Sequence, residues 1–296
     1  TSRGLGDVYK RQDHDQPKKV EIIAFEGSFH GRSSAGIAAA GGEKLTKGFG
    51  PLIPGFLQVQ WADHEAITSA ITPNTAAIII EPIQGEGGIR PLPDQCLREL
   101  RKLCDDHGIL LILDEVQCGV GRTGKFFAHE WSGINPDIMM IAKGIGGGFP
   151  LGAVLATENA AFGMTAGTHG STYGGNPLAC AVGCSVVELI TDPTFLKDVR
   201  RKAALLMQSL LGLVASHPEI FEDVRGYGLM LGLKCKLQNT EVLAACYAQE
   251  LITVPAADNV IRLLPPLNLS DEEIGQAILR LNNAANACKE TLKETA

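Results

Sequence analysis

The first two thirds of the chain alternate between short apolar runs and stretches with helical spacing. Continuous apolar runs predict buried strands at Val20–Phe25, 76–83 (AAIIIEPI), 108–117 (GILLILDEVQ) and 138–142. Helices are predicted over 64–71, Asp94–His107 and Leu178–Ile190, and the small residues of the last one predict close packing on the sheet. Strand and helix alternating at this interval predict a doubly wound α/β fold, with functional groups at the carboxyl ends of its strands.

The pattern changes at Thr191. A long amphipathic helix is predicted from Asp192-Pro193 to about His217, followed by a strand pair at 224–235, a helix from Glu241 and a strand at Val260–Leu264. A final helix begins at Ser270, where SDEE is a capping box. We therefore expect a larger domain over 13–190 and a compact α+β domain over 191–296. Residues 1–12 show no period and are expected to be extraneous or disordered.

Composition narrows the function classes. The net charge is −7 and there is no run of Lys or Arg, so the chain carries no electrostatic footprint for nucleic acid and we expect small-molecule partners. The eight cysteines show no CxxC spacing, which favours a reducing, cytoplasmic compartment, and no metal site is expected. No signal-peptide core and no run long enough to span a bilayer is seen in the sequence, so no membrane association is predicted.

The stretch 137–152, DIMMIAKGIGGGFPLG, is the strongest candidate for chemistry. It places Lys143 between an apolar strand and a glycine-rich turn. Poor solvation there would lower the cost of a neutral amine, the form that attacks a carbonyl to make a Schiff base. The alternative is a solvated lysine at a strand end. Asp114, at the end of the preceding predicted strand, favours the first interpretation, because a lysine and a carboxylate are the pair that pyridoxal phosphate (PLP) requires.

Two other segments offer candidate groups. In EGSFHGRSSAG (26–36), Phe29 has the shape to cover a planar ring and Arg32 the shape to bind a carboxylate. Taken alone, such residues are more often a packed aromatic and a surface arginine. GVGRTG (119–124) matches a dinucleotide fingerprint and nearly a P-loop by letter. Both readings are rejected, because the next strand ends in Lys143 rather than an acid and Phe126 follows Lys125.

Six motifs together carry a family resemblance. They are FHGRS (29–33), EPIQGEGG (81–88), LDEVQCGVGRTG (113–124), AKGIGGGFPLG (142–152), HGSTYGGNP (169–177) and VIRLLPPLN (260–268). In this order they resemble the class III, PLP-dependent aminotransferases, from about residue 20 to the C-terminus. The resemblance implies the type I fold of PLP enzymes, an α/β fold with a mainly parallel sheet in the large domain and a smaller α+β C-terminal domain.

The resemblance also implies roles for single residues. Lys143 would form the Schiff base with PLP, and Asp114 would pair with the pyridine nitrogen. The other cofactor-binding residues would be Phe29 and Val116 on the two ring faces, Gln117 at the ring hydroxyl, Glu115, and Thr172 at the phosphate, including the partner subunit's Thr172. Arg32 and Ser171 would contact the distal end of the amino donor. Arg262 would take the α-carboxylate of 2-oxoglutarate, and Glu86 would pair with Arg262 when the donor is bound.

The implied reaction moves the terminal amino group of N2-acetylornithine to 2-oxoglutarate in arginine biosynthesis, in a homodimer with shared active sites. Succinylornithine, ornithine, 4-aminobutyrate and N-succinyl-diaminopimelate remain alternative donors, and an inactive remnant is a further alternative. In one respect the chain departs from the family, because no phosphate-cradling glycine loop precedes Val20. We therefore expect a chain truncated at its N-terminus that binds PLP poorly by itself.

Overall fold

The computed structural model describes residues 19–295, which form two compact units. The first unit comprises the described residues up to Pro82, together with Leu92–Val120 and Phe127–Ile190. The second unit comprises Ile83–Pro91, Gly121–Phe126 and the chain from Thr191 onward. Two short segments that precede residue 190 thus belong to the second unit, so the division of the chain into 13–190 and 191–296 stays a prediction. The segment 1–12 lies outside the described residues.

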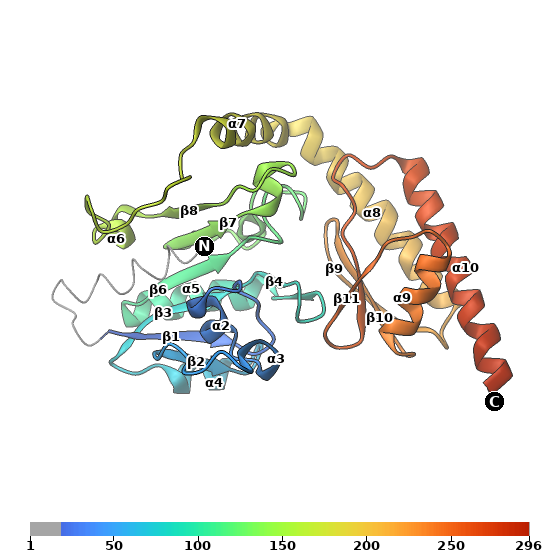
Figure 1. Cartoon of the computed structure of the whole chain (residues 1–296), viewed down its shortest axis with the longest axis horizontal. Coiled ribbons are helices and arrows are strands. Elements are labelled where there is room, and N and C mark those ends of the chain that lie inside the picture. The colour runs from blue at the N-terminus through green and yellow to red at the C-terminus, as the bar shows by residue number, and fades with distance from the viewer. Residues whose placement is uncertain (1–18, 296) are drawn as a thin grey trace. The chain divides into compact units, whose positions relative to one another are not determined.

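A six-stranded sheet forms the centre of the first unit (Figure 1). Its order is β2-β1-β3-β6-β7-β8, and every neighbouring pair is parallel except β7 with β8. β3, β6 and β7 are buried at every position, which explains their continuous apolar sequences. The strand bounds are β1 (Glu21–Phe25), β2 (Phe56–Val59), β3 (Thr75–Ile80), β6 (Leu110–Asp114), β7 (Ile138–Ile141) and β8 (Ala153–Ala156).

The helices of the first unit differ in how much of their surface they bury. α5 buries Leu97, Leu100 and Cys104 along one side, and its bounds agree with the predicted helix. α7 was expected to pack closely on the sheet, and this expectation is wrong. Much of α7 is exposed, with Leu178 at 62% and Leu189 at 57%. The helix bounds are α2 (Ser34–Ala40), α3 (Glu43–Thr46), α4 (His64–Ala70), α5 (Asp94–His107), α6 (Glu158–Ala161) and α7 (Pro177–Thr191).

The small residues of α7 have a narrower purpose than sheet packing. A Cβ atom placed on Gly183 would lie 2.9 Å from Cδ2 of Leu151, so the glycine allows close approach to the segment that follows Lys143. Ala179 and Ile190 of the helix are also buried, whereas Leu178 and Leu189 lie on the surface of the single chain.

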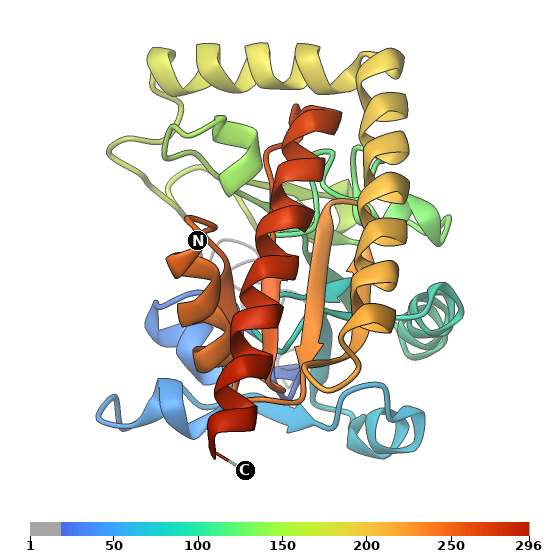
Figure 2. The same ribbon diagram turned by 90° about the vertical axis from the view of Figure 1, so that its right-hand side faces the viewer.

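The second unit is an antiparallel sheet covered by helices. Its sheet has the order β11-β12-β10-β9, and Figure 2 shows α8 and α10 running across one side of it. Leu206 and Leu210 of α8 share a core with Leu231 and Leu233 of β10 and Leu281 of α10. The bounds are α8 (Pro193–Ser216), β9 (Phe221–Tyr227), β10 (Met230–Cys235), α9 (Asn239–Ala248), β11 (Val254–Ala256), β12 (Val260–Leu263) and α10 (Asp271–Thr295).

A small hairpin also belongs to this unit. It consists of β4 (Ile83–Gln84) and β5 (Arg90–Pro91), which pair antiparallel.

The capping box predicted from SDEE at the start of α10 is confirmed. The backbone N–H of Ser270 donates to Glu273 at 2.6 Å, and the backbone N–H of Glu273 donates to the Ser270 hydroxyl at 3.1 Å.

The expected fold class is confirmed, since a mainly parallel α/β sheet is accompanied by a smaller α+β unit. The elements that the sequence analysis missed are short, namely β2, β8, β11, the β4–β5 hairpin, α2, α3, α6 and the two 3-10 helices Ala128–Trp131 and Lys143–Gly146. All eight cysteines are free thiols, and Cys180 and Cys184 are exposed on α7.

Among the described residues, no single helix is long and apolar enough to cross a membrane, and the bent pair α7 and α8 meets that test by length and composition only.

Candidate active site

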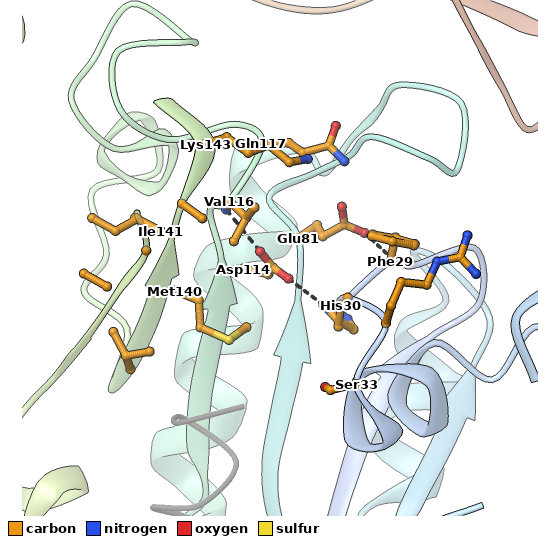
Figure 3. Close-up of a pocket in the computed structure, with 16 residues that line it drawn as sticks. Phe29, His30, Ser33, Glu81, Asp114, Val116, Gln117, Met140, Ile141 and Lys143 are labelled. Carbon is orange, nitrogen blue, oxygen red and sulfur yellow. Dashed lines mark hydrogen bonds and ion pairs between the residues drawn. The ribbon is translucent and has the colours of Figure 1, made fainter. Parts of the chain in front are cut away.

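A cavity of about 570 Å³ opens in the first unit, where the carboxyl ends of its parallel strands meet (Figure 3). This volume is in the range of small-molecule sites. β1 leads into the loop that carries Phe29, β3 into Glu81, β6 ends in Asp114, and β7 leads into Lys143. The full lining is Phe29, His30, Gly31, Arg32, Ser33, Glu81, Asp114, Val116, Gln117, Met140, Ile141, Ala142, Lys143, Gly152, Ala153 and Val154.

Asp114 is buried at the floor of this cavity, and its two carboxylate oxygens have different partners. One oxygen lies 2.8 Å from Nδ1 of His30, and the other accepts the backbone N–H of Val116 at 3.1 Å. Figure 3 shows Asp114 between these two residues. A carboxylate fixed at both oxygens is held in one orientation.

His30 is the principal residue that sequence reasoning missed. Burial lowers the pKa of His30, but its hydrogen bond to Asp114 and the negative charges of Asp114 and Glu81 raise it, and the net pKa lies above its ordinary value. The imidazole is thus favoured in its charged form beside the carboxylate. The available signal was the position of His30 inside FHGRS, directly after Phe29.

Glu81 fixes the loop that carries the aromatic side of the cavity. Its carboxylate accepts the backbone N–H of Phe29 at 3.0 Å, which ties the end of β3 to the loop after β1. The Arg32 guanidinium carbon lies 5.5 Å from the centre of the Phe29 ring, a cation–π contact. Arg32 is exposed while it lines the cavity, so the guanidinium remains open to a ligand.

Lys143 lies at the carboxyl end of β7 in an unusual backbone conformation. Its φ is +51°, in the left-handed region that non-glycine residues rarely adopt. The next residue approaches another loop closely, because a Cβ atom on Gly144 would lie 3.2 Å from Cβ of Val120. Sequence reasoning expected a poorly solvated lysine, whereas the residue is exposed in the single chain. A residue held in such a conformation is a candidate for function rather than for stability.

Three neighbours in the DEVQ motif behave differently from one another. Val116 and Gln117 line the cavity, as the resemblance implied. Glu115 was expected among the cofactor-binding residues, but its side chain does not line this cavity. Its buried carboxylate accepts the backbone N–H groups of Ala128 at 2.6 Å and His129 at 2.9 Å, and lies 2.7 Å from Nδ1 of His129. Glu115 therefore holds the loop that follows β6.

Ser171 and Thr172 lie in an exposed loop between α6 and α7. The Ser171 hydroxyl accepts the backbone N–H of Gly174 at 2.8 Å. Neither residue is among those of the described chain that line the cavity. The structure thus brings together Phe29, Arg32, Asp114, Val116, Gln117 and Lys143, but not these two.

The two remaining candidates, Glu86 and Arg262, pair with each other in the second unit. Nη1 of Arg262 lies 2.6 Å from Oε1 of Glu86, and Nη2 lies 3.2 Å from Oε2, so the pair is bidentate. Arg262 is nearly buried in β12, whereas Glu86 comes from the hairpin loop. This pairing agrees with the one that the resemblance implied.

The comparison with known proteins decides the family. The chain matches the family model described as aminotransferase class-III over residues 6–285. The chain belongs to the class III aminotransferases. The matched range begins inside the segment 1–12 that sequence reasoning set apart.

Two curated aminotransferases share much of the sequence. The acetylornithine aminotransferase of Rhodobacter capsulatus is 64% identical over 273 residues, which is 92% of this chain and 70% of the relative. The acetylornithine aminotransferase of Mesorhizobium japonicum is 59% identical over 276 residues, covering 93% of this chain and 69% of the relative.

Solved aminotransferase structures agree with the fold. The ornithine aminotransferase of Toxoplasma gondii matches with a TM-score of 0.91 at 28% identity, and the match covers 99% of this chain and 71% of the Toxoplasma chain. The N-acetylornithine aminotransferase of Stenotrophomonas maltophilia matches with a TM-score of 0.81 at 33% identity, and the match covers 98% of this chain and 71% of the Stenotrophomonas chain.

The His30–Asp114 pair of this class III aminotransferase generates a first prediction. Because the pKa of His30 is raised in the folded state, its contribution to stability is fully present below pH 6.5 and is lost as pH rises through the folded pKa. Denaturant unfolding at several pH values should show this loss in the unchanged protein and not in His30→Ala. Just below pH 6.5, His30→Ala should be less stable by about 3–5 kcal/mol, since it leaves a buried carboxylate without its partner.

His107→Ala is the matched control, because His107 is exposed at the end of α5. It should leave both the stability and its pH dependence nearly unchanged. Parallel pH profiles for His30→Ala and the unchanged protein would contradict a charged pair at Asp114.

Proposed function

We propose that the chain is an acetylornithine aminotransferase. It moves the terminal amino group of N2-acetyl-L-ornithine to 2-oxoglutarate and yields N-acetyl-L-glutamate 5-semialdehyde and L-glutamate, in arginine biosynthesis. The observation that carries this proposal is the 64% identity to the Rhodobacter capsulatus acetylornithine aminotransferase over 92% of the chain. The free thiols support a reducing compartment, and we place the reaction in the cytoplasm.

The cofactor in this proposal is PLP. The Toxoplasma gondii enzyme has partial occupancy of PLP at its active site. The cavity described here suits a planar, basic ring, because it offers an aromatic side chain (Phe29), an aliphatic one (Val116) and a buried carboxylate (Asp114) in the same space. When bound, PLP supplies an electron-withdrawing ring that stabilises negative charge on the carbon of the donor.

Lys143 transfers the proton of the donor carbon, and Asp114 holds the ring nitrogen in its protonated form. The amine of Lys143 takes the proton from the donor carbon that bears the amino group, and returns a proton when the reaction runs with 2-oxoglutarate. Asp114 keeps the proton on the ring nitrogen, and each pKa unit gained there is about 1.4 kcal/mol. His30 orients Asp114 through the 2.8 Å contact.

The remaining cavity residues bind and orient. Gln117 is assigned to the ring hydroxyl, and Thr172 to the cofactor phosphate. Arg32, stacked on Phe29 and exposed to the cavity, is assigned with Ser171 to the acylated end of the donor. A planar guanidinium suits this task, because it binds carboxylate and carbonyl oxygens in a fixed geometry.

Arg262 and Glu86 give the enzyme its two substrate types. The reacting end of acetylornithine carries no carboxylate, whereas that of 2-oxoglutarate does. With the donor, Glu86 neutralises Arg262 through the bidentate pair, and with 2-oxoglutarate, Arg262 takes the α-carboxylate. The pairing matters because a buried arginine left without a counter-charge would cost several kcal/mol.

Donor choice tests the proposal directly. Steady-state rates should be compared for acetylornithine, succinylornithine, ornithine, 4-aminobutyrate and N-succinyl-diaminopimelate, with 2-oxoglutarate as acceptor and PLP present. Acetylornithine should have the highest kcat/KM. A higher value for another donor would keep the family and overturn the proposed substrate.

Lys143→Ala is the control for that comparison, because it removes the amine and leaves the cavity. It should abolish multiple turnover with every donor. Turnover retained in this variant would contradict the role of Lys143.

Glu86→Ala tests the exchange of partners at Arg262. Arg262 would then be exposed to the donor without its counter-charge, so the donor half-reaction should slow while the 2-oxoglutarate half-reaction is kept. Single-turnover absorbance measurements of the two halves separate these effects, and amines that bear an α-carboxylate should become better donors. Equal loss in the two halves would argue against the exchange.

We also propose that two copies of the chain form a dimer in which Thr172 serves the site of the neighbouring subunit. The exposed apolar side chains of α7 and the exposed Thr172 loop support this arrangement. Lys143→Ala and Thr172→Ala subunits should each be impaired alone. Mixed after unfolding and reassembly, they should recover about a quarter of the normal activity, because one site of each mixed dimer then holds both unchanged residues.

One outcome of the same mixing experiment would contradict the proposal. If Thr172 serves its own subunit, no site in any mixed dimer has both residues, and no activity returns. Samples reassembled from one variant only provide the baseline.

A further inference from the structure

The loop that carries Glu86 is rich in glycine, yet its backbone is fixed at several points. The loop joins β4 to β5 and reads GEGGI over residues 85–89. Glycines on both sides of Glu86 would favour many conformations in isolation. The contacts that fix the backbone of this loop determine whether Glu86 moves together with the loop or by its side chain alone.

The first fixed point is the turn between β11 and β12. The backbone N–H of Ala257 donates to the carbonyl oxygen of Glu86 at 3.0 Å. Gly88, at φ +106°, lies so close that a Cβ atom there would be 2.7 Å from the carbonyl oxygen of Ala257. The hairpin backbone thus rests directly on this turn, with no room for a side chain between them.

The second fixed point is the side chain of Ile89. It is 0% exposed and lies over two glycines of the small sheet. A Cβ atom on Gly226 would be 3.0 Å from Cγ2 of Ile89, and one on Gly232 would be 3.0 Å from its Cγ1. We call the space over Gly226 and Gly232 that the Ile89 side chain fills the seat. Gly232 pairs directly with Arg262 across β10 and β12, so the seat lies beside the arginine that Glu86 binds.

Ile89 also has a backbone conformation that needs an explanation. Its φ is +48°, which is rare for a β-branched residue and persists only where the surroundings impose it. A glycine would adopt this conformation without strain, but it would leave the space above Gly226 and Gly232 empty. The strained residue is therefore the one that fills the seat.

The two partners of the ion pair differ in freedom. The Arg262 side chain is 6% exposed, and its Nη2 also donates to the carbonyl oxygen of Pro255 at 3.3 Å. The Glu86 side chain is 41% exposed. With the loop backbone fixed on both sides, the Glu86 side chain is the part that can leave.

We propose that Ile89 is a positioning residue for substrate choice. By filling the seat over Gly226 and Gly232, it holds the hairpin so that Glu86 reaches Arg262 in one rotamer and leaves it by side-chain rotation alone. This inference rests on the proposed function, because it concerns how one enzyme accepts both a donor without an α-carboxylate at its reacting end and 2-oxoglutarate.

The test compares two opposite changes at the seat in the PLP-loaded enzyme. Ile89→Ala empties the space over Gly226 and Gly232. Gly232→Ala crowds it, because the added Cβ atom would lie 2.7 Å from Cγ1 of Val260 and 3.0 Å from Cγ1 of Ile89. Both should lower the ratio of kcat/KM for acetylornithine to kcat/KM for glutamate by about tenfold, because both displace Glu86 from Arg262. Calorimetric titration should also show 2-oxoglutarate binding to these variants more tightly than to the unchanged enzyme, since Arg262 is released from its partner.

Ile220→Ala is the matched control. Ile220 is an equally buried isoleucine of the same unit, which directly precedes β9 and belongs to the core that includes Leu210 and Leu281. It should lower the melting temperature at least as much as Ile89→Ala while the substrate ratio stays unchanged. A similar fall of the ratio in the control would reduce the role of Ile89 to general stability and overturn the proposal.

A double-mutant cycle separates positioning from packing. In a Glu86→Ala background the side chain that Ile89 positions is absent, so adding Ile89→Ala should leave the ratio where Glu86→Ala put it. A further fall of the same size in that background, or no fall in the single variant, overturns the inference. If the unchanged enzyme does not use acetylornithine at all, the proposed function fails instead, and this outcome is visible before any variant is made.

Discussion

The parallel alignment of β1, β3, β6 and β7 is the constraint on which the active site depends. Each strand is pinned to its neighbour by a register of hydrogen-bonded partners, so their carboxyl ends fall at one edge of the sheet. Glu81, Asp114 and Lys143 are far apart in sequence and meet because of this alignment alone. No long-range contact between their side chains is needed to bring them together.

In an extended strand of this sheet, the side chains of neighbouring residues point to opposite faces of the sheet. Asp114 and Glu115 are adjacent acids at the end of β6, yet Asp114 lines the cavity and Glu115 holds the segment 128–129 on the other side. Successive side chains of an extended chain alternate in direction, so only one of two adjacent carboxylates can serve a ligand. The second one supports the loop on which Val116 and Gln117 lie.

Much of this arrangement was accessible from the sequence, and the reasons are specific. The runs that became β3, β6 and β7 are apolar throughout because both faces are buried, and α5 has three buried positions at helical spacing. β8 could not be found, since most of AVLA is exposed and its four residues show no alternation. His30 was missed because a histidine letter carries no sign of its partner, which lies 84 positions away. The alternation at Asp114 and Glu115 was readable in principle, once the strand end was known.

The left-handed backbone of Lys143 has a consequence for how the protein tolerates change. At φ +51° a glycine would be the more comfortable residue, and relief of such a conformation is of the order of 1 kcal/mol. A Lys143→Gly chain would thus lose the lysine amine and yet relieve this backbone strain. Under the proposed function, selection for thermal resistance alone would favour an inert protein at this position, whereas selection on turnover would retain the lysine.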